Sequence, residues 1–360
     1  MPLRPRPELD NLVPSAHGGP NQAEFKKLGL KLDDIIDFSV SADPFMSPPE
    51  LSKIVDSDSI SRLPDPEATE FREVLSKKLD VPFNSLIAGN GAMELIHLIA
   101  QAYFSQGDSI LIPEPTFGEY RMACQIAGAF ILEHRAKEEE NFAHRIDETV
   151  EQIKRNRPKG VFICNPNNPT GCYLSREEIE TVLNACQDTL LVIDEAYVSF
   201  AENAWSSLDL VKRRNVTILR SMTKDQALAG LRLGYAVAHQ DIINAMRRVQ
   251  LPWSVNAVAQ RAGIVALRNR DCTEDHREKI RQAKQFMINE LVRIGYSPKP
   301  SETNFFLVNV GDGKGFRTAL LRQGMLVRDC ASFGLPEYVR IAVLGIAECK
   351  KLISAVEKLK

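Results

Sequence analysis

The sequence lacks a charge excess of one sign, and it lacks long apolar runs. Its 45 lysines and arginines face 47 acidic residues, so the net charge of -2 gives no general attraction to nucleic acid or to an anionic membrane. Apolar runs such as residues 189–193 fall far short of the roughly 20 residues that cross a bilayer, and the first residues lack the apolar core of a signal peptide. We therefore expect a soluble, cytoplasmic protein that binds a small molecule, without nucleic-acid or membrane partners.

Two further absences narrow the chemistry. The seven cysteines are an odd number without a C-x-x-C pair, which argues against a disulfide framework and a zinc knuckle, so no metal site is expected. We expect reduced, mostly packed thiols at Cys124, Cys164, Cys172, Cys186, Cys272, Cys330 and Cys349. The dinucleotide fingerprint G-x-G-x-x-G is missing too, since the segment Gly89–Glu94 ends in glutamate. A nicotinamide-dependent dehydrogenase is therefore disfavoured.

What the chain contains is an alternation of helical patterns with short apolar strands between about residues 65 and 240. This alternation is typical of an α/β fold with a mostly parallel sheet flanked by helices. The expected strands are 110–112, 160–164, 190–193, 217–219 and 235–238. Ser175 and Glu178 form a capping-box pattern at the start of a helix predicted over 175–186. In such a sheet, function is expected at the carboxyl ends of the strands.

The 360 residues, 44% of them hydrophobic, allow more than one lobe. We expect an N-terminal arm over 1–45, rich in proline and glycine, that lies on the small domain or on a partner subunit. A large domain is expected over 46–247. A smaller α+β domain is expected over 248–360, from amphipathic stretches at 241–268 and 273–295 and from strand- or helix-like segments at 305–309, 314–323 and 338–358.

Lys224 lies just beyond an apolar strand, in the segment Ser221-Met222-Thr223-Lys224. A lysine at such a place is costly unless it is paired, neutral or covalently used, and desolvation is one way in which an amine nucleophile is activated. Arg232, eight residues later, offers a forked donor for a phosphate. Taken alone, the segment also fits a solvated loop lysine.

Three other segments lie at strand ends or at the start of a helix. Asp194-Glu195-Ala196-Tyr197 places a carboxylate directly after the strand 190–193, where a helix cap is the alternative interpretation. Asn165–Gly171 follows the strand that ends at Cys164 and, taken alone, is a turn. Gly89–Glu94 begins a helix, whose free N–H groups make an anion site.

These four segments resemble the fold-type I pyridoxal-phosphate enzymes of the class I and II aminotransferase superfamily, and the likeness extends over residues 17–358. The resemblance implies pyridoxal 5'-phosphate as cofactor, held by Lys224 as a Schiff base, with the same lysine carrying the proton at the substrate α-carbon. Asp194 would pair with the pyridine nitrogen, and Asn168 and Tyr197 would hydrogen-bond the ring's 3-hydroxyl oxygen. Lys224, Asp194 and Tyr197 are thus the implied catalytic residues.

The same resemblance assigns the rest of the pocket. Phe117 would stack on the cofactor ring, with a core phenylalanine as the alternative interpretation. Arg340 matches the arginine that clamps the substrate carboxylate through two parallel hydrogen bonds, although an arginine on an apolar strand is otherwise often an edge residue. A homodimer is implied, because the family builds each site from both subunits. The implied cofactor-phosphate ligands are Gly91, Ala92, Met93, Ser221, Thr223 and Arg232.

Two branches of the superfamily compete for this chain. The segments 17–19, 37–39 and 327–335 look more like the threonine-phosphate decarboxylase of the cobalamin pathway than like histidinol-phosphate aminotransferase. In the decarboxylase branch His17 and Arg328 would bind the substrate's phosphate, with Asn168 and Arg340 completing the substrate site. The expected enzyme therefore acts on a small amino acid, phosphorylated or not, as either a decarboxylase or a transaminase.

Three residues depart from the pattern of these branches. Asp43 adds a negative charge where asparagine is usual, which disfavours a phosphorylated substrate unless a cation offsets it. Leu63 replaces a tyrosine that reaches the neighbouring subunit's cofactor phosphate, and Leu344 stands where relatives of the decarboxylase tend to carry a basic residue. A non-catalytic cofactor-binding regulator is the alternative of another class, disfavoured because the lysine, aspartate and arginine set is intact.

Overall fold

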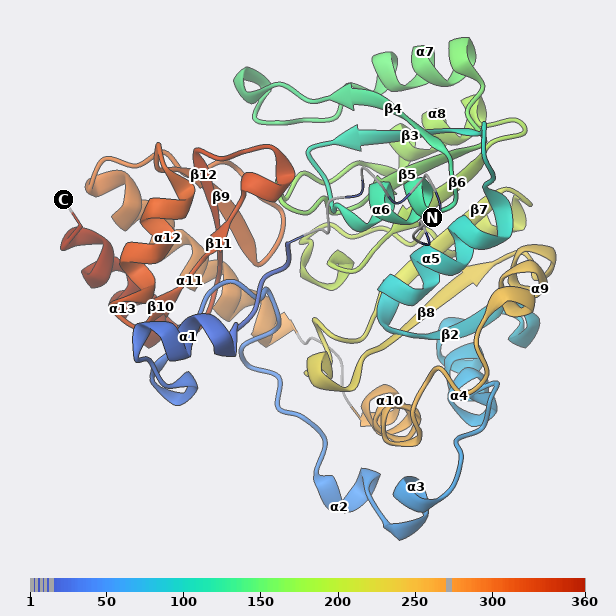
Figure 1. Cartoon of the computed structure of the whole chain (residues 1–360), viewed down its shortest axis with the longest axis horizontal. Helices are drawn as coiled ribbons and strands as arrows, with labels where there is room; N and C mark the ends of the chain where they lie inside the picture. The colour runs from blue at the N-terminus through green and yellow to red at the C-terminus, as the bar shows by residue number, and fades with distance from the viewer. Residues whose placement is uncertain are drawn as a thin grey trace.

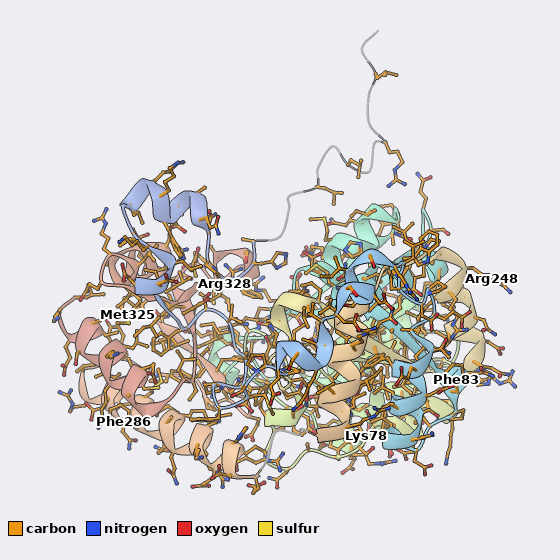
Figure 2. The ribbon with its side chains drawn as sticks, turned by 90° about the horizontal axis from the view of Figure 1, so that it is seen from below. Lys78, Phe83, Arg248, Phe286, Met325 and Arg328 are labelled. Atoms are coloured by element: carbon orange, nitrogen blue, oxygen red, sulfur yellow. The ribbon has the colours of Figure 1, made fainter. Side chains whose placement is uncertain are left out.

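The computed structural model describes residues 16–269 and 274–359, together with Leu3, Arg6, Leu9 and Leu12. Figure 1 shows a large lobe, built on a seven-stranded sheet, beside a small lobe formed mainly by the C-terminal part of the chain. In Figure 2, Lys78, Phe83 and Arg248 lie in the large lobe, whereas Phe286, Met325 and Arg328 lie in the small one. Cys272 and the predicted helix start at residue 273 lie outside the described residues.

The large lobe confirms the predicted α/β fold. Its strand order is β2-β8-β7-β6-β5-β3-β4, and all neighbours are parallel except β8, which runs antiparallel to both β2 and β7. The central strands β5 and β6 are buried along their whole length, as expected for apolar strands covered on both faces. The strands are β2 (Leu86–Asn90), β3 (Ser109–Glu114), β4 (Phe130–Arg135), β5 (Gly160–Cys164), β6 (Leu190–Asp194), β7 (Val216–Ser221) and β8 (Leu233–Ala238).

Helices cover both faces of this sheet. One hydrophobic cluster joins it to α5 (Gly91–Tyr103), α6 (Glu119–Ile126) and α9 (Gln240–Val249). The other cluster joins it to α4 (Thr69–Leu79), α7 (Ile146–Asn156), α8 (Arg176–Ala185) and α10 (Ala257–Asn269). The predicted capping box is present at α8, where the Ser175 hydroxyl accepts from the Glu178 N–H and the Glu178 carboxylate accepts from the Ser175 N–H. None of the described helices is long and apolar enough to span a membrane.

The small lobe has a three-stranded antiparallel sheet in the order β11 (Arg328–Asp329), β12 (Tyr338–Ala342), β9 (Phe305–Asn309). Helices α11 (Glu274–Arg293), α12 (Gly313–Leu321) and α13 (Ile346–Glu357) complete the lobe. Part of the N-terminal segment packs on it, because β1 (Ile36–Asp37) pairs with β10 (Met325–Leu326) and Phe25 of α1 (Gln22–Leu28) contacts Leu326. Two short helices, α2 (Leu51–Ile54) and α3 (Ser57–Ser61), lead into the large lobe.

The amphipathic stretch predicted over 241–268 is divided into two helices, α9 and α10. The chain turns between them at Pro252 and Trp253, which has a positive φ of 60°. Ala259 and Ala262 of α10 belong to the same buried cluster as Phe71 of α4, so α10 packs with the large lobe. The domain limits 1–45, 46–247 and 248–360 therefore stay a proposal, and the packing favours a later boundary, between α10 and α11.

Candidate functional site

A cavity of about 450 Å³ lies at the carboxyl ends of β5, β6 and β7, where Cys164, Asp194 and Ser221 line it. Residues of the small lobe, including Arg328 and Arg340, line the same cavity. Gly91 is the predicted residue that does not line it. The other predicted residues do: His17, Ala92, Met93, Phe117, Asn168, Asp194, Tyr197, Ser221, Thr223, Lys224, Arg232, Arg328 and Arg340.

Asp194 ends β6 and is buried, with only 4% of its surface exposed. Its carboxylate accepts hydrogen bonds from the Tyr120 hydroxyl at 2.7 Å and from the Ala196 N–H at 2.9 Å. Burial raises the pKa of Asp194, and the hydrogen bond from Tyr120 opposes that rise. Such a buried carboxylate is suited to a cationic partner inside the cavity.

Lys224 follows β7 in the turn that connects it to β8. Its Nζ atom lies 5.7 Å from the centre of the Tyr197 ring, and that ring packs edge-on against Phe305 of the small lobe. The backbone carbonyl of Lys224 accepts a hydrogen bond from the Asp43 N–H at 2.7 Å. The lysine is thus held from the side of the N-terminal segment, and its amine shares the cavity with Asp194 and Tyr197.

One end of the cavity is built for an anion. Helix α5 begins at Gly91 without a side-chain cap, so its first N–H groups are available to a ligand. Gly91 has φ +75°, and a Cβ atom there would lie 2.8 Å from Nη2 of Arg232. The hydroxyls of Ser221 and Thr223 are 2.7 Å apart and line the same cavity. A guanidinium, two hydroxyls and a helix N-terminus together fit a phosphate group.

Arg340, on β12, lines the same cavity and is 5% exposed. Its Nη1 donates to the side-chain oxygen of Asn168 at 2.6 Å, and its Nη2 donates to the Ser39 carbonyl at 2.7 Å. The Nε atom is buried without a hydrogen-bond partner among the described residues. The guanidinium also lies over the Phe305 ring, 4.9 Å from its centre, so its plane is held in a fixed orientation.

Arg328 and His17 lie where the N-terminal segment crosses the cavity. Nη2 of Arg328 donates to the Ala16 carbonyl and to the Ser332 hydroxyl, both at 2.6 Å. Burial lowers the pKa of Arg328 from its usual value. Nε2 of His17 lies 3.0 Å from the Glu119 carboxylate, and the His17 ring is 5.9 Å from that of Phe117. His17 therefore lies in the cavity of its own chain.

Sequence reasoning missed several residues that shape this site. Tyr120 bonds Asp194 across 74 positions, and Glu119 accepts from His17 and lies 3.3 Å from His97. Hydrogen bonds from these two histidines hold the pKa of Glu119 down to about 2. In the sequence, Tyr120 and Glu119 were marked only by their position close to Phe117. No group of three or more histidines, cysteines or carboxylates among the described residues is arranged to hold a metal ion.

The three departures from the family pattern lie away from the cavity lining. The Asp43 carboxylate is buried, 2.9 Å from Nδ1 of His276, and also accepts from the Phe45 N–H at 2.9 Å. The Asp43 carboxylate is therefore engaged by groups outside the cavity. Leu63 is 72% exposed, and Leu344 packs against the core of the small lobe.

Comparisons with known proteins indicate the same superfamily as the sequence motifs. The family model for aminotransferase class I and II matches residues 33–356. A histidinol-phosphate aminotransferase of Thermoanaerobacter sp. (strain X514) is 35% identical over 323 residues, which cover 88% of this chain and 90% of the relative. The crystal structure of L-threonine-O-3-phosphate decarboxylase from Porphyromonas gingivalis is 28% identical, with a TM-score of 0.78 over 89% of this chain and 98% of that one. A histidinol-phosphate aminotransferase from Sinorhizobium meliloti, solved in complex with pyridoxal-5'-phosphate, shares the fold with a TM-score of 0.86 at 22% identity, over 99% of this chain and 98% of that one.

Proposed function

We propose, from the premise that this chain belongs to the pyridoxal-phosphate-dependent class I and II aminotransferases, that it transfers the amino group of a small phosphorylated amino compound. The observation that carries the proposal is the arrangement of one cavity. A buried carboxylate and a lysine share this cavity with an anion site at the start of α5 and with an arginine whose Nε has no partner among the described residues. This arrangement matches a cofactor with a phosphate at one end and a substrate anion beyond it.

The residues present fit pyridoxal phosphate. Its phosphate would be held by the N-terminus of α5, by Ser221 and Thr223 and by Arg232. Asp194 would hold a proton on the pyridine nitrogen, and Phe117 would cover the ring. When bound, the cofactor supplies an aromatic ring that withdraws electrons from the bonds at the substrate α-carbon.

Lys224 would hold the cofactor covalently, and its free amine would take the proton from the substrate α-carbon. Tyr197 and Asn168 would hydrogen-bond the hydroxyl oxygen of the cofactor ring. Asn168 is also bonded to Arg340, so the ring and the substrate clamp share one side chain. A displacement of Arg340 would therefore disturb both sites.

Transamination is favoured over decarboxylation. Arg340 is fixed by Asn168 and Ser39 from two sides, and a carboxylate bound to it is held rather than released. The sequence relative described above is a histidinol-phosphate aminotransferase, whereas the decarboxylase is a structural neighbour at 28% identity. These likenesses support the aminotransferase branch better than the decarboxylase branch that the segments near His17 and Arg328 had favoured.

The positive charges that line the cavity support a phosphorylated substrate. Arg328 and Arg340 both line the cavity, in addition to Arg232, which is assigned to the cofactor phosphate. Asp43, which had opposed a phosphorylated substrate, has its carboxylate against His276. The cavity therefore holds more cationic groups than a single carboxylate requires.

The substrate test uses the purified holoenzyme with histidinol phosphate and a 2-oxo acid, and in parallel with O-phosphothreonine. We expect transfer of the amino group from histidinol phosphate, measured as formation of the new amino acid, and no release of carbon dioxide from O-phosphothreonine. Histidinol is the matched control without the phosphate and should react far more slowly. Release of carbon dioxide from O-phosphothreonine would contradict the proposed reaction.

A homodimer is part of the same proposal. Four large apolar side chains are exposed on two neighbouring segments, namely Ile60, Leu63, Leu251 and Trp253. The ion pair of Arg261 with Asp56 at 2.6 Å joins α10, which follows one of these segments, to the start of α3 in the other. A second copy of the chain would cover this apolar surface. Light scattering should give the mass of two chains, and the double variant Leu63→Asp, Leu251→Asp should shift the protein toward the monomer.

A further inference from the structure

A second layer of polar residues surrounds a separate cavity of about 260 Å³, and Ser221 lines both this cavity and the first one. Its members adjoin the proposed cofactor residues in the sequence: Glu195 follows Asp194, Ser199 lies two positions after Tyr197, and Asp225 follows Lys224. Nothing in the proposed reaction uses these side chains. The other polar residues around this cavity are Lys78, Arg220, Ser221, Gln226, Tyr235 and Arg277.

Two contacts within the layer connect the segment after β6 with the segment of β7 and its turn. Nε and Nη2 of Arg220 both lie 2.7 Å from the same carboxylate oxygen of Glu195. The Ser199 hydroxyl, on the turn Val198–Phe200, donates to the carboxylate of Asp225 at 2.5 Å. The first contact joins neighbours of Asp194 and Ser221, and the second joins neighbours of Tyr197 and Lys224.

Asp225 is an unfavourable residue to bury. Its Oδ2 accepts from Ser199, but its Oδ1 is buried and has no hydrogen-bond partner among the residues that the structure describes. Burial raises the pKa of Asp225, and the hydrogen bond from Ser199 opposes that rise. A buried acceptor without a partner lowers the stability of the fold, so stability alone does not account for this carboxylate.

We propose that Asp225 is a positioning residue, whose hydrogen bond with Ser199 fixes Lys224 relative to Tyr197. The two residues lie 26 positions apart, on different connections of the sheet. The bond joins the turn that carries Tyr197 to the turn that carries Lys224. The inference rests on the role proposed for Lys224, but it does not depend on which amino compound is the substrate.

The test is a double-mutant cycle of Ser199→Ala and Asp225→Ala, measured on cofactor binding. The readouts are the dissociation constant of pyridoxal phosphate from the refilled apoenzyme, the visible circular dichroism for each bound cofactor, and the melting temperature of the apoenzyme. Ser199→Thr is the conservative variant, because threonine keeps the hydroxyl. Ser76→Ala is the matched control. Ser76 lies on α4, away from the cavity, and its hydroxyl donates a hydrogen bond of 2.6 Å to the Val81 carbonyl.

Each alanine variant should weaken cofactor binding about tenfold and reduce the visible circular dichroism, as expected for loss of a hydrogen bond to a carboxylate. The double variant should bind no more weakly than the single ones, because both remove the same contact. Ser199→Thr should bind like the wild type, and Ser76→Ala should change only the melting temperature.

Two results would overturn the proposal. Effects of the single variants that multiply in the double variant would show that the two side chains act separately. Variants that lower the melting temperature while leaving the dissociation constant and the circular dichroism unchanged would show a purely structural role. Failure of the substrate assays would leave this outcome unaffected, because every readout here uses the cofactor alone.

Discussion

Asp194→Asn separates the catalytic role of the buried carboxylate from its effect on stability. The Asp194 carboxylate lines the cavity and accepts hydrogen bonds from the Tyr120 hydroxyl and from the Ala196 N–H. An ion pair with a ring nitrogen at such a place is worth about 4 kcal/mol at an effective dielectric constant of about 20. Because each 1.36 kcal/mol or so is a factor of ten, the variant should lose roughly a thousandfold in kcat at saturating cofactor.

The same variant should also change the stability of the apoenzyme, and this change becomes more favourable as the pH rises. Burial raises the pKa of Asp194 in the folded state, so the stability associated with this group is present below its unfolded pKa and is lost as the pH rises through its folded pKa. Asparagine does not titrate. The free energy of unfolding of the variant, relative to that of the wild type, should therefore rise between pH 4 and pH 8.

Stopped-flow absorbance with excess cofactor gives the rate of the first half-reaction and so measures the catalytic effect. Urea unfolding of the two apoenzymes at several pH values measures the difference in stability. Tyr120→Phe is the graded comparison, with an expected loss of about tenfold to a hundredfold, because it removes one hydrogen bond to a charged group. A loss below tenfold for Asp194→Asn, or a stability difference that does not vary with pH, would refute the reasoning.

Three other perturbations have defined outcomes. Arg340→Lys should raise the KM of a carboxylate-bearing amino acid about a hundredfold, because lysine cannot make two parallel hydrogen bonds, and steady-state kinetics measures this. Gly91→Ala should weaken pyridoxal-phosphate binding about tenfold in a titration, because the φ of +75° is strained for alanine and the new Cβ meets Arg232 at 2.8 Å. His17 and His97 hold the pKa of Glu119 at about 2, below its value in the unfolded chain. The contribution of Glu119 to the stability of the fold is therefore present above about pH 4.5 and is lost as the pH falls toward 2. The difference in melting temperature between the wild type and Glu119→Gln should shrink over that interval.

The sequence was informative where burial alone determines structure. The strands 160–164 and 305–309 occur with the predicted limits, because they are apolar runs buried almost throughout. The strand β2 was missed because it ends in Gly89 and Asn90, which are uncommon in strands, and β4 was missed because its exposed edge carries charged residues.

The candidate site was predictable because its motifs follow buried strands, whose carboxyl ends meet at one edge of the sheet. Contacts between distant segments were not predictable. Tyr120 reaches Asp194 only because α6 presents that face to β6, and His276 reaches Asp43 across 233 positions. The family likeness therefore predicted residues that line one cavity, whereas the surroundings of Asp43 and His17 required the structure.

The role of Lys224 is tested most directly by borohydride reduction of the holoenzyme, followed by peptide mass spectrometry. The wild type should show a visible absorption band that reduction abolishes, with one cofactor fixed to Lys224 per chain. Lys224→Ala should lack both the fixed cofactor and amino transfer, while pyridoxal phosphate still binds reversibly. A cofactor fixed to a different lysine in the wild type, or a Lys224→Ala variant that keeps its amino-transfer rate, would contradict the assignment.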